Sequence, residues 1–466
     1  MTNSERKLKG REISSEGHER VEKLPRSPKR DVSYWLDSPN GRHEYTHQLF
    51  RFPAKFHPPV VRWALGSYGR RGSIVLDPFT GSGTVQVEAL TRGISSVGID
   101  IDPLACLIAR AKTTLLNPEK LQRAFDKVQA TLTPFVKAHS DQETIPGSDI
   151  SKGWFEEESA GVAIPPIPNI IHWFRRYVIV DLARIFWALE QSHLSESENQ
   201  FFRACVVAII RRVSNADPAP VSGLEVTSIQ AKKNATRKIR VFDVFFTKTR
   251  QAIQGMEHLW NACHQYEPIA VAQVRRGDAL DLTELRDSIP LAQDGFPLVI
   301  TSPPYCRSVE YSRRHQLEMY WLGMIRSPAE HVALTHTYIG RKLVRASDWD
   351  EKVEFGIEQL DDTLHQIMDR DPKKARTVRH YFYSMWEIFG ALNQVVKRSG
   401  TVVCVIGNSV CCQVPIPTVD VIAELAADHF KIKNRFSYAL RNHYMQYGLW
   451  NGDGIKQEYV LVMKPR

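Results

Sequence analysis

The sequence predicts a doubly wound (Rossmann-like) α/β fold, and two neighbouring stretches of chain carry this prediction. Residues 74–77 are mostly apolar and end in an acid, a Gly-x-Gly turn follows, and residues 85–90 have helical character. Residues 96–100 then form a second short apolar run that ends in Asp100. Strand, glycine turn, helix, strand and acid, in this order, are typical of the first half of a doubly wound nucleotide site. We therefore expect a parallel sheet with helices on its faces.

The glycine turn has the composition of a ligand-binding loop. Gly81 and Gly83 allow the backbone to turn tightly and to approach a ligand closely. The amino terminus of the helix after Thr84 favours a carboxylate or another anion. Asp100 is placed to accept hydrogen bonds from ribose hydroxyls. Asp102 then caps a further helix that extends to about residue 112. An α/β domain without a cofactor is the competing interpretation, and the presence of both halves argues against it.

A second motif lies some two hundred residues downstream. Residues 296–300 are expected to form a short strand, and Thr301, Ser302, Pro303, Pro304 and Tyr305 follow it. Two prolines cannot donate ladder hydrogen bonds, so the strand ends in a rigid turn. The turn offers a hydroxyl, free carbonyls and an aromatic ring, a surface suited to a planar base with an exocyclic amino group. Alone, such a segment is more often an ordinary Pro-Pro turn, and its pairing with the glycine turn favours a site.

Together the two motifs resemble those of the S-adenosylmethionine-dependent DNA amino-methyltransferases, and Ser-Pro-Pro-Tyr is similar to the cytosine-N4 group of that family. Residues 53–60 resemble the motif that precedes the first strand in the family, and residues 277–279 resemble its third-strand acid. Residues 401–409 and 416–418 resemble a late strand and its loop. The resemblance covers roughly residues 46–115 and 271–466 and implies a class I methyltransferase sheet.

The resemblance also implies a cofactor and a set of site residues. The cofactor is S-adenosylmethionine, and its expected binding residues are Lys55, Phe56, Asp77, Phe79, Thr80, Gly81, Ser82, Gly83, Thr84, Asp100, Ile101, Asp278 and Ala279. The expected catalytic residues are Ser302, Pro303, Pro304 and Tyr305. Accepting the amino hydrogens at Ser302 and at the Pro303 carbonyl would favour the pyramidal nitrogen that attacks. Tyr305 would stack on the base, and Phe79 or Tyr305 could face the sulfonium methyl group. Cys306 is expected to be a small buried residue, because this chemistry needs no thiolate.

The pattern along the chain predicts four segments. Residues 1–45 are polar and expected to be a disordered tail, and residues 46–115 form the first, cofactor-binding part of the methyltransferase domain. Residues 116–270 are expected to be a mainly helical insert, with helices near 121–138 and 201–210. Residues 271–466 form the second, catalytic part. In this part, the charged residues 343–375 predict a loop or lid, residues 376–396 a long helix, and residues 431–440 and 458–464 a terminal hairpin.

The charge balance favours a polyanionic partner. The formal net charge is +9, and residues 203–250 hold ten Lys or Arg against three Asp or Glu, a local balance of +7. The insert is therefore a candidate DNA-recognition module, with a solubilising face as the alternative. Candidate DNA contacts are Arg211, Arg212, Lys232, Lys233, Arg237 and Lys238, with Arg307 near the base pocket.

The expected function is transfer of a methyl group from S-adenosylmethionine to the N4 amino group of cytosine in DNA after base flipping. Three alternatives stay open: adenine-N6 methylation of DNA, methylation of a guanine amino group in structured RNA, and a DNA-binding protein of this fold without turnover.

The seven cysteines show no metal-ligand spacing, so no metal is expected. No segment resembles a membrane span or signal peptide, and we expect a cytoplasmic protein. A cognate restriction endonuclease or other defence partner is a further possibility.

Overall fold

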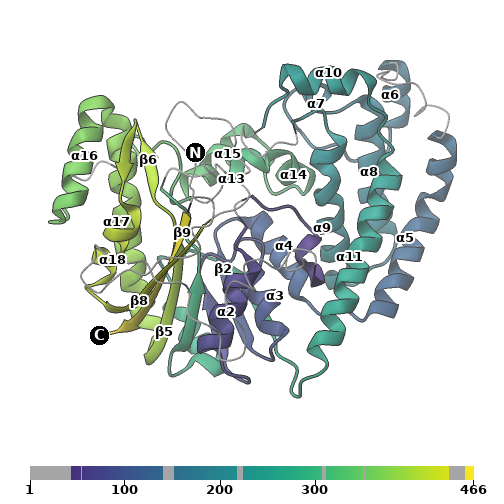
Figure 1. Ribbon diagram of the computed structural model, residues 1–466. Coiled ribbons are helices and arrows are strands. Elements are labelled where there is room, and N and C mark those ends of the chain that lie inside the picture. The colour runs from purple at the N-terminus through teal and green to yellow at the C-terminus, as the bar shows by residue number, and fades with distance from the viewer. Residues whose placement is uncertain are drawn as a thin grey trace, which may run out of the picture.

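A seven-stranded sheet forms the centre of the molecule in the computed structural model (Figure 1). The structure describes residues 44–53, 55–139, 152–217, 224–306, 311–349, 353–439 and 457–466. The strand order is β3-β2-β1-β4-β5-β9-β8. The parallel strands are β1 (Ile74–Asp77), β2 (Ser95–Asp100), β3 (Ala272–Arg276), β4 (Phe296–Thr301) and β5 (Val396–Ile406). The hairpin of β8 (Phe430–Ala439) and β9 (Gln457–Pro465) completes the sheet, with β9 antiparallel to β5. The doubly wound sheet and its terminal hairpin are confirmed.

Helices cover both faces of this sheet, because its parallel strands are apolar on both sides. Along β1, Ile74 and Leu76 point into one core and Val75 into the other. The first core contains side chains of α12 (Glu284–Ser288), α16 (Glu358–Arg370), α17 (Pro372–Val395) and α18 (Thr418–Ala426). The second contains side chains of α2 (Pro58–Tyr68) and α3 (Thr84–Leu90). The chain order reverses between β1 and β4, and in such sheets ligands bind at the carboxyl ends of the strands beside this point.

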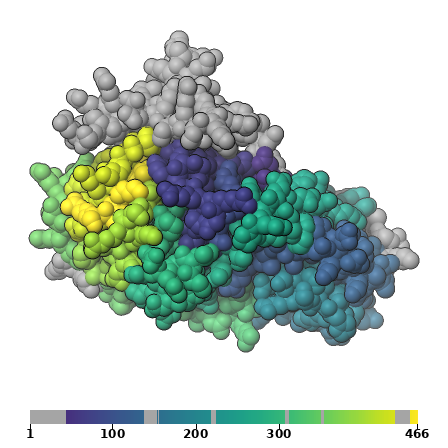
Figure 2. All heavy atoms as spheres, turned by 90° about the horizontal axis from the view of Figure 1, so that it is seen from below, coloured from purple at the N-terminus to yellow at the C-terminus, as the bar shows by residue number. Residues whose placement is uncertain are grey.

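The expected insert is helical and stands beside the sheet (Figure 1). It follows α4 (Pro103–Thr113) and consists of α5 (Pro118–His139), α6 (Lys152–Glu158), α7 (Ile170–Trp173), α8 (Arg176–Gln191), α9 (Glu196–Val213), α10 (Ser228–Thr236) and α11 (Val241–Cys263). The helices expected near 121–138 and 201–210 are confirmed as α5 and α9. Seen from below, the first part of the sheet domain lies between the insert and the carboxyl-terminal strands (Figure 2).

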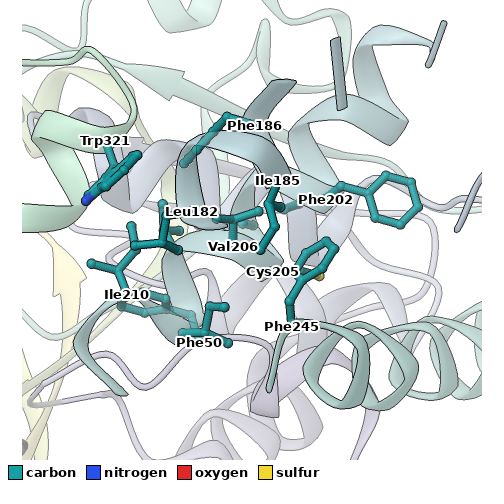
Figure 3. Close-up of a cluster of buried hydrophobic side chains, with 14 of the residues drawn as sticks. Phe50, Leu182, Ile185, Phe186, Phe202, Cys205, Val206, Ile210, Phe245 and Trp321 are labelled. Carbon is teal, nitrogen blue, oxygen red and sulfur yellow. The ribbon is translucent and has the colours of Figure 1, made fainter. Parts of the chain in front are cut away.

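The core of the insert includes side chains from outside it (Figure 3). Phe50, which precedes the first strand, packs near Ile210 of α9. Trp321 of α14 (Gln316–Trp321) follows residues 302–305, the Ser-Pro-Pro-Tyr tetrad, and stacks on Phe186 of α8 with ring centroids 5.7 Å apart. Leu104 and Ile108 of α4 belong to the same core. The insert and the sheet domain therefore share one continuous apolar interior.

One prediction for the catalytic part, residues 271–466, is wrong. The charge of residues 343–375 predicts a loop or lid, but this segment includes α16, which packs against α17. Leu360, Leu364 and Ile367 are buried at helical spacing between the charged residues. The high charge of this segment belongs to the outer face of an amphipathic helix.

The remaining elements are short. They are η3 (Tyr45–Gln48), η5 (Pro290–Ala292), α13 (Tyr311–Arg314), α15 (Pro328–His336), β6 (Ser409–Cys411) and β7 (Val414–Ile416). Cys306 is buried, as expected. The expected tail, residues 1–45, lies almost entirely outside the described residues. In the part of the chain that is described, no helix has both the length and the apolar character needed to span a membrane.

Candidate active site

A cavity of about 860 Å³ opens at the carboxyl ends of β1, β2, β3 and β4. It is lined by the loops after these four strands, by the segment before α2 and by residues near 338. The lining residues are Phe52, Lys55, Phe56, Asp77, Pro78, Phe79, Thr80, Gly81, Ser82, Thr84, Asp100, Ile101, Asp102, Asp278, Ala279, Ser302, Pro304, Tyr311, Thr337, Tyr338 and Ile339. The glycine turn and the tetrad turn therefore reach one cavity.

The glycine turn is held against β2 and α4. Gly83 has φ 76° and is the N-cap of α3, and a Cβ atom there would lie 3.1 Å from the Cα of Ala109. Gly83 thus allows α3 to approach α4 and is not part of the cavity wall. The Thr80 hydroxyl donates to Gln86 at 2.6 Å, in space left by Gly98 on β2. These contacts fix the turn before any ligand binds.

Lys112, a buried lysine of α4, holds the glycine turn in place. The Nζ of Lys112 donates to the carbonyl oxygen of Ser82 at 2.5 Å and lies 3.4 Å from its Oγ. Lys112 is fully buried, and burial lowers its pKa well below the usual value. Sequence reasoning missed this residue. The available signal is its place four residues after Ile108, on the apolar stripe of α4.

Two carboxyl groups, the buried Asp77 and the partly buried Asp100, hold the motifs of the site in place. The Oδ1 of Asp77 accepts from the Phe79 amide at 3.1 Å and from the Thr301 hydroxyl at 2.9 Å, which ties β1 to the start of the tetrad. The Oδ2 of Asp100 accepts from the Gly81 amide at 2.7 Å. Burial raises the pKa of each carboxyl group to about 7. Perturbed pKa values within one cavity are typical of functional sites.

The tetrad forms another part of the cavity wall, at the end of the strand next to β1. Ser302 and Pro304 line the cavity, Pro303 is buried, and Tyr305 is partly buried behind them. The Tyr305 hydroxyl donates to Oε1 of Glu458 at 2.8 Å. On the other side, a Cβ atom at Gly340 would lie 2.9 Å from the Tyr305 carbonyl oxygen. The tetrad turn is therefore held by the hydrogen bond of the Tyr305 hydroxyl and by the close packing of its backbone against Gly340.

Several wall residues were missed by sequence reasoning. Tyr311 stacks on Phe52, with ring centroids 5.7 Å apart and an interplanar angle of 22°. Thr337, Tyr338 and Ile339 cover the side near Asp102 and the tetrad. These residues come from segments without a recognisable motif. Only the fold of the chain after residue 305 brings them to the cavity, so no local sequence pattern could reveal them.

The candidate DNA-contacting residues fall into two groups, which differ in their exposure. The guanidinium of Arg211 donates to the carbonyl oxygens of Asp217, at 2.8 and 3.0 Å, and of Arg314, at 2.9 Å. The guanidinium of Arg237 donates to the Ser214 carbonyl oxygen at 3.2 Å. These two half-buried arginines donate to backbone carbonyls of the protein itself, and their contact with DNA stays a prediction. The exposed residues are Arg212, Lys232, Lys233 and Lys238. Arg307 lies outside the described residues.

The residues present suit a nucleoside with a charged sulfonium tail. Asp100 and Asp278 supply carboxylates at the ends of β2 and β3, and Phe56 and Phe79 supply aromatic faces. Lys55, whose Nζ donates to the His47 carbonyl oxygen at 3.0 Å, supplies a cation to the same cavity. Within the described ranges, no group of three or more His, Cys, Asp or Glu side chains is arranged to hold a metal ion.

Comparison with known proteins agrees with this site. Residues 4–111 match the model of the N6/N4 methyltransferase family, described as DNA methylase. The chain is 23% identical over 399 residues to the Type II methyltransferase M.MvaI of Kocuria varians, covering 82% of this chain and 81% of the relative. It is 23% identical over 300 residues to M.BsoBI of Geobacillus stearothermophilus, covering 61% and 54%. A 119-residue stretch is 34% identical to M.MjaII of Methanocaldococcus jannaschii, covering 26% and 22%.

Solved structures give more remote likenesses. The rRNA methyltransferase aviRa from Streptomyces viridochromogenes aligns with a TM-score of 0.32 at 10% identity, covering 94% of this chain and 96% of the other. TrmN from Thermus thermophilus aligns with a TM-score of 0.29 at 9% identity, covering 88% and 49%. The fold assignment rests instead on the strand order of the sheet.

The sheet order is that of the class I methyltransferase fold, and the family match over residues 4–111 implies that the cofactor of this fold is S-adenosylmethionine. The glycine turn and the Ser-Pro-Pro-Tyr turn share one cavity. The family match over residues 4–111 and the similarity to Type II methyltransferases, together with this shared cavity, support an assignment to the N4/N6 DNA methyltransferase group.

Proposed function

We propose that this protein transfers a methyl group from S-adenosylmethionine to the N4 amino group of cytosine in DNA, after flipping the base out of the duplex. One observation carries the proposal. Ser302 and Pro304 line the same cavity as Gly81 and Asp100, so a donor at the glycine turn and an amine at the tetrad would meet there.

The cofactor-binding roles follow from the chemistry of each wall. Asp100 would accept hydrogen bonds from ribose hydroxyls, and Asp278 and Ala279 would border the adenine. Lys55 and the amino terminus of α3 at Thr84 would hold the carboxylate of the methionine end. When bound, S-adenosylmethionine supplies a methyl group activated by a sulfonium. The protein needs only to position it and to exclude water.

The catalytic roles rest on the tetrad. The Ser302 hydroxyl oxygen and the Pro303 carbonyl would accept the two amino hydrogens of the base. These contacts keep the nitrogen lone pair available and stabilise the positive charge that develops on the nitrogen. Tyr305 would stack on the base from behind the turn.

Cytosine is preferred over adenine because Ser precedes Pro-Pro-Tyr here, where the adenine-N6 group more often has Asp or Asn. Adenine N6 is the second candidate, since the N4 and N6 enzymes share the family that the chain matches. The names of the Type II relatives support a further proposal, that a cognate restriction endonuclease accompanies this enzyme in the cytoplasm.

DNA contact is proposed for the exposed basic residues of the insert. Lys232 and Lys233 lie on α10, and Lys238 and Arg212 lie on or next to neighbouring helices. Exposed Lys and Arg side chains would bind phosphates and thus orient the duplex over the cavity.

A labelling experiment tests the substrate class. The purified protein is incubated with S-adenosylmethionine labelled in its methyl group and with either duplex DNA of mixed sequence or transfer and ribosomal RNA. Label is expected in the DNA only. Label in RNA alone would move the assignment to the guanine amino-methyltransferases.

A further inference from the structure

Glu88 is a buried acid of α3 to which the proposed function assigns no role. It is fully buried and does not line the cavity. Its Oε1 lies 2.8 Å from Nε2 of His47 in η3, and its Oε2 accepts from Nε of Arg62 in α2 at 2.8 Å. The Arg62 guanidinium also donates to Oε1 at 3.0 Å. One carboxylate therefore joins the two elements that precede the first strand.

The segment between these two elements carries part of the cavity wall. Residues 49–57 connect η3 to α2, and the wall residues among them are Phe52, Lys55 and Phe56. At the first end, the Thr46 hydroxyl also donates to the Lys112 carbonyl oxygen of α4 at 2.8 Å. The segment is thus a loop whose two ends are joined at Glu88 and whose middle reaches the cavity.

The surroundings of His47 and Glu88 fix the direction of the hydrogen bond between them. Burial and the nearby Lys55 lower the pKa of His47 to about 3, so its imidazole is neutral at pH 7. Burial raises the pKa of Glu88, but the hydrogen bonds from His47 and Arg62 lower it by more, to about 2. An ionised carboxylate can only accept, so Nε2 of His47 carries the ring proton and donates it to Glu88. Among the described residues, Nδ1 of this buried ring has no hydrogen-bond partner, so the bond to Glu88 is the polar contact that orients the imidazole.

The backbone of His47 reaches the cavity through Lys55. The His47 carbonyl oxygen accepts from Nζ of Lys55 at 3.0 Å, and Lys55 itself lines the cavity. A lysine side chain is long and flexible, and this bond limits the positions that its ammonium can take. The place of the ammonium therefore depends on where the His47 carbonyl lies, and the anchored ring of the same residue holds that carbonyl.

We propose that His47, anchored by Glu88, is a positioning residue that holds the Lys55 ammonium where it meets the carboxylate of the bound cofactor. This inference rests on the proposed role of Lys55 at the methionine end of S-adenosylmethionine. Without the bond to Glu88, η3 keeps its bond to α4 but can move relative to α3, and the His47 carbonyl moves with it. The cofactor carboxylate then loses a partner that is held in place before binding.

Two ligands that differ only in the group on their sulfur test the proposal. S-adenosylhomocysteine carries the amino acid group, and 5′-methylthioadenosine has a methyl group in its place. Lys55→Met is expected to weaken binding of S-adenosylhomocysteine by about 30-fold, as for loss of a hydrogen bond between charged groups. His47→Phe keeps a ring but cannot donate to Glu88, and it should weaken the same binding by about tenfold. Calorimetry measures each Kd, and the Kd for 5′-methylthioadenosine should stay within about twofold in both variants, because this ligand has no carboxylate.

A conservative variant and a matched control accompany these changes. His47→Gln should recover most of the affinity for S-adenosylhomocysteine, because its side-chain amide can donate to Glu88 from a position close to that of Nε2. His380→Phe makes the same change at a half-buried position of α17, on the other face of the sheet, and should alter neither Kd.

A double-mutant cycle separates positioning from a general structural effect. In the Lys55→Met background, His47→Phe should cause no further loss of affinity for S-adenosylhomocysteine. Multiplied losses would overturn the proposal, as would an equal loss of affinity for both ligands in His47→Phe. If the wild-type protein binds neither ligand, the proposed function itself fails. If Lys55→Met weakens binding of S-adenosylhomocysteine and His47→Phe does not, only the role of His47 fails.

Discussion

At the scale of single residues, Asp100 shows how burial tunes the site. Its carboxylate accepts from the backbone amides of Gly81 and Asp102, at 2.7 and 2.9 Å, and these bonds lower its pKa. Desolvation and the neighbouring Asp102 raise it by more, so the pKa of Asp100 is about 7. The residue proposed to hold the ribose therefore titrates near neutral pH.

Cofactor affinity should accordingly depend on pH. Ribose hydroxyls donate to the ionised carboxylate, so binding favours ionisation and releases protons. The Kd for S-adenosylmethionine is expected to increase as pH falls from about 8 to about 6, by up to about tenfold per pH unit below the raised pKa. Calorimetry in buffers of different ionisation enthalpy measures both the Kd and the proton release.

Asp100→Asn provides the control for this pH dependence. The variant should bind more weakly and lose the dependence, although Asp77, whose pKa is also about 7, is retained. Asp77 accepts from Thr301 and Phe79 within the protein and should not titrate on binding. A wild-type Kd that is constant over this pH range would contradict the role assigned to Asp100.

At the scale of elements, α4 both supports the sheet and positions the glycine turn. Asp102 caps this helix through the amides of Leu104 and Ala105, and Lys112 in its last turn holds the Ser82 carbonyl. The cofactor loop is thus fixed from two elements, β2 and α4. Loss of the hydrogen bond from α4 should loosen the loop without unfolding the sheet.

Lys112→Met tests this support. Methionine has a similar length but donates no hydrogen bond, so the Ser82 carbonyl is left buried and unsatisfied. The free energy of unfolding is expected to fall by about 1–3 kcal/mol, measured by urea denaturation. Affinity for S-adenosylmethionine should weaken several-fold. Lys120→Met, at an exposed position on α5, should change neither quantity, and equal behaviour of the two variants would contradict the account.

The elements that the sequence could predict are those with a local pattern. The strand, glycine turn and acid around Gly81 and Asp100 follow directly from residue order, as does the break at the Pro-Pro turn.

Helix α16 was missed because its charged face outweighs three buried apolar residues in composition. Glu458 and Tyr311 carry no local signal, because only the folding of distant segments brings them to the tetrad and to Phe52. The hydrogen bonds of Arg211 and Arg237 to backbone carbonyls of the protein also carry no local signal, because their acceptors are placed by the fold.

At the scale of the whole molecule, the insert is attached to the catalytic part by a shared core. Phe50, Ile108 and Trp321 come from three segments outside the insert and pack with its helices. DNA bound to the exposed lysines of α10 would therefore be held by a body that is continuous with the tetrad. This arrangement suits an enzyme that must place one base precisely.

Charge removal on the insert tests this placement. The combined change Arg212→Gln, Lys232→Gln, Lys233→Gln and Lys238→Gln should weaken DNA binding. It should also flatten the dependence of log K on log salt by up to about 0.9 for each phosphate that the variant no longer neutralises. Fluorescence anisotropy at several salt concentrations measures the slope. Lys431→Gln with Lys433→Gln, exposed on the far strand β8, is the matched control. An unchanged slope in the insert variant would mark these residues as a solubilising face.

The most direct test of the central claim is the identity of the modified base. The protein is expressed in a host that lacks N4-methylcytosine, and the host DNA is digested to nucleosides and analysed by mass spectrometry. The account predicts N4-methylcytosine, which should disappear when Ser302 and Tyr305 are replaced by alanine. DNA that carries only N6-methyladenine, or no new methylated base at all, would contradict it.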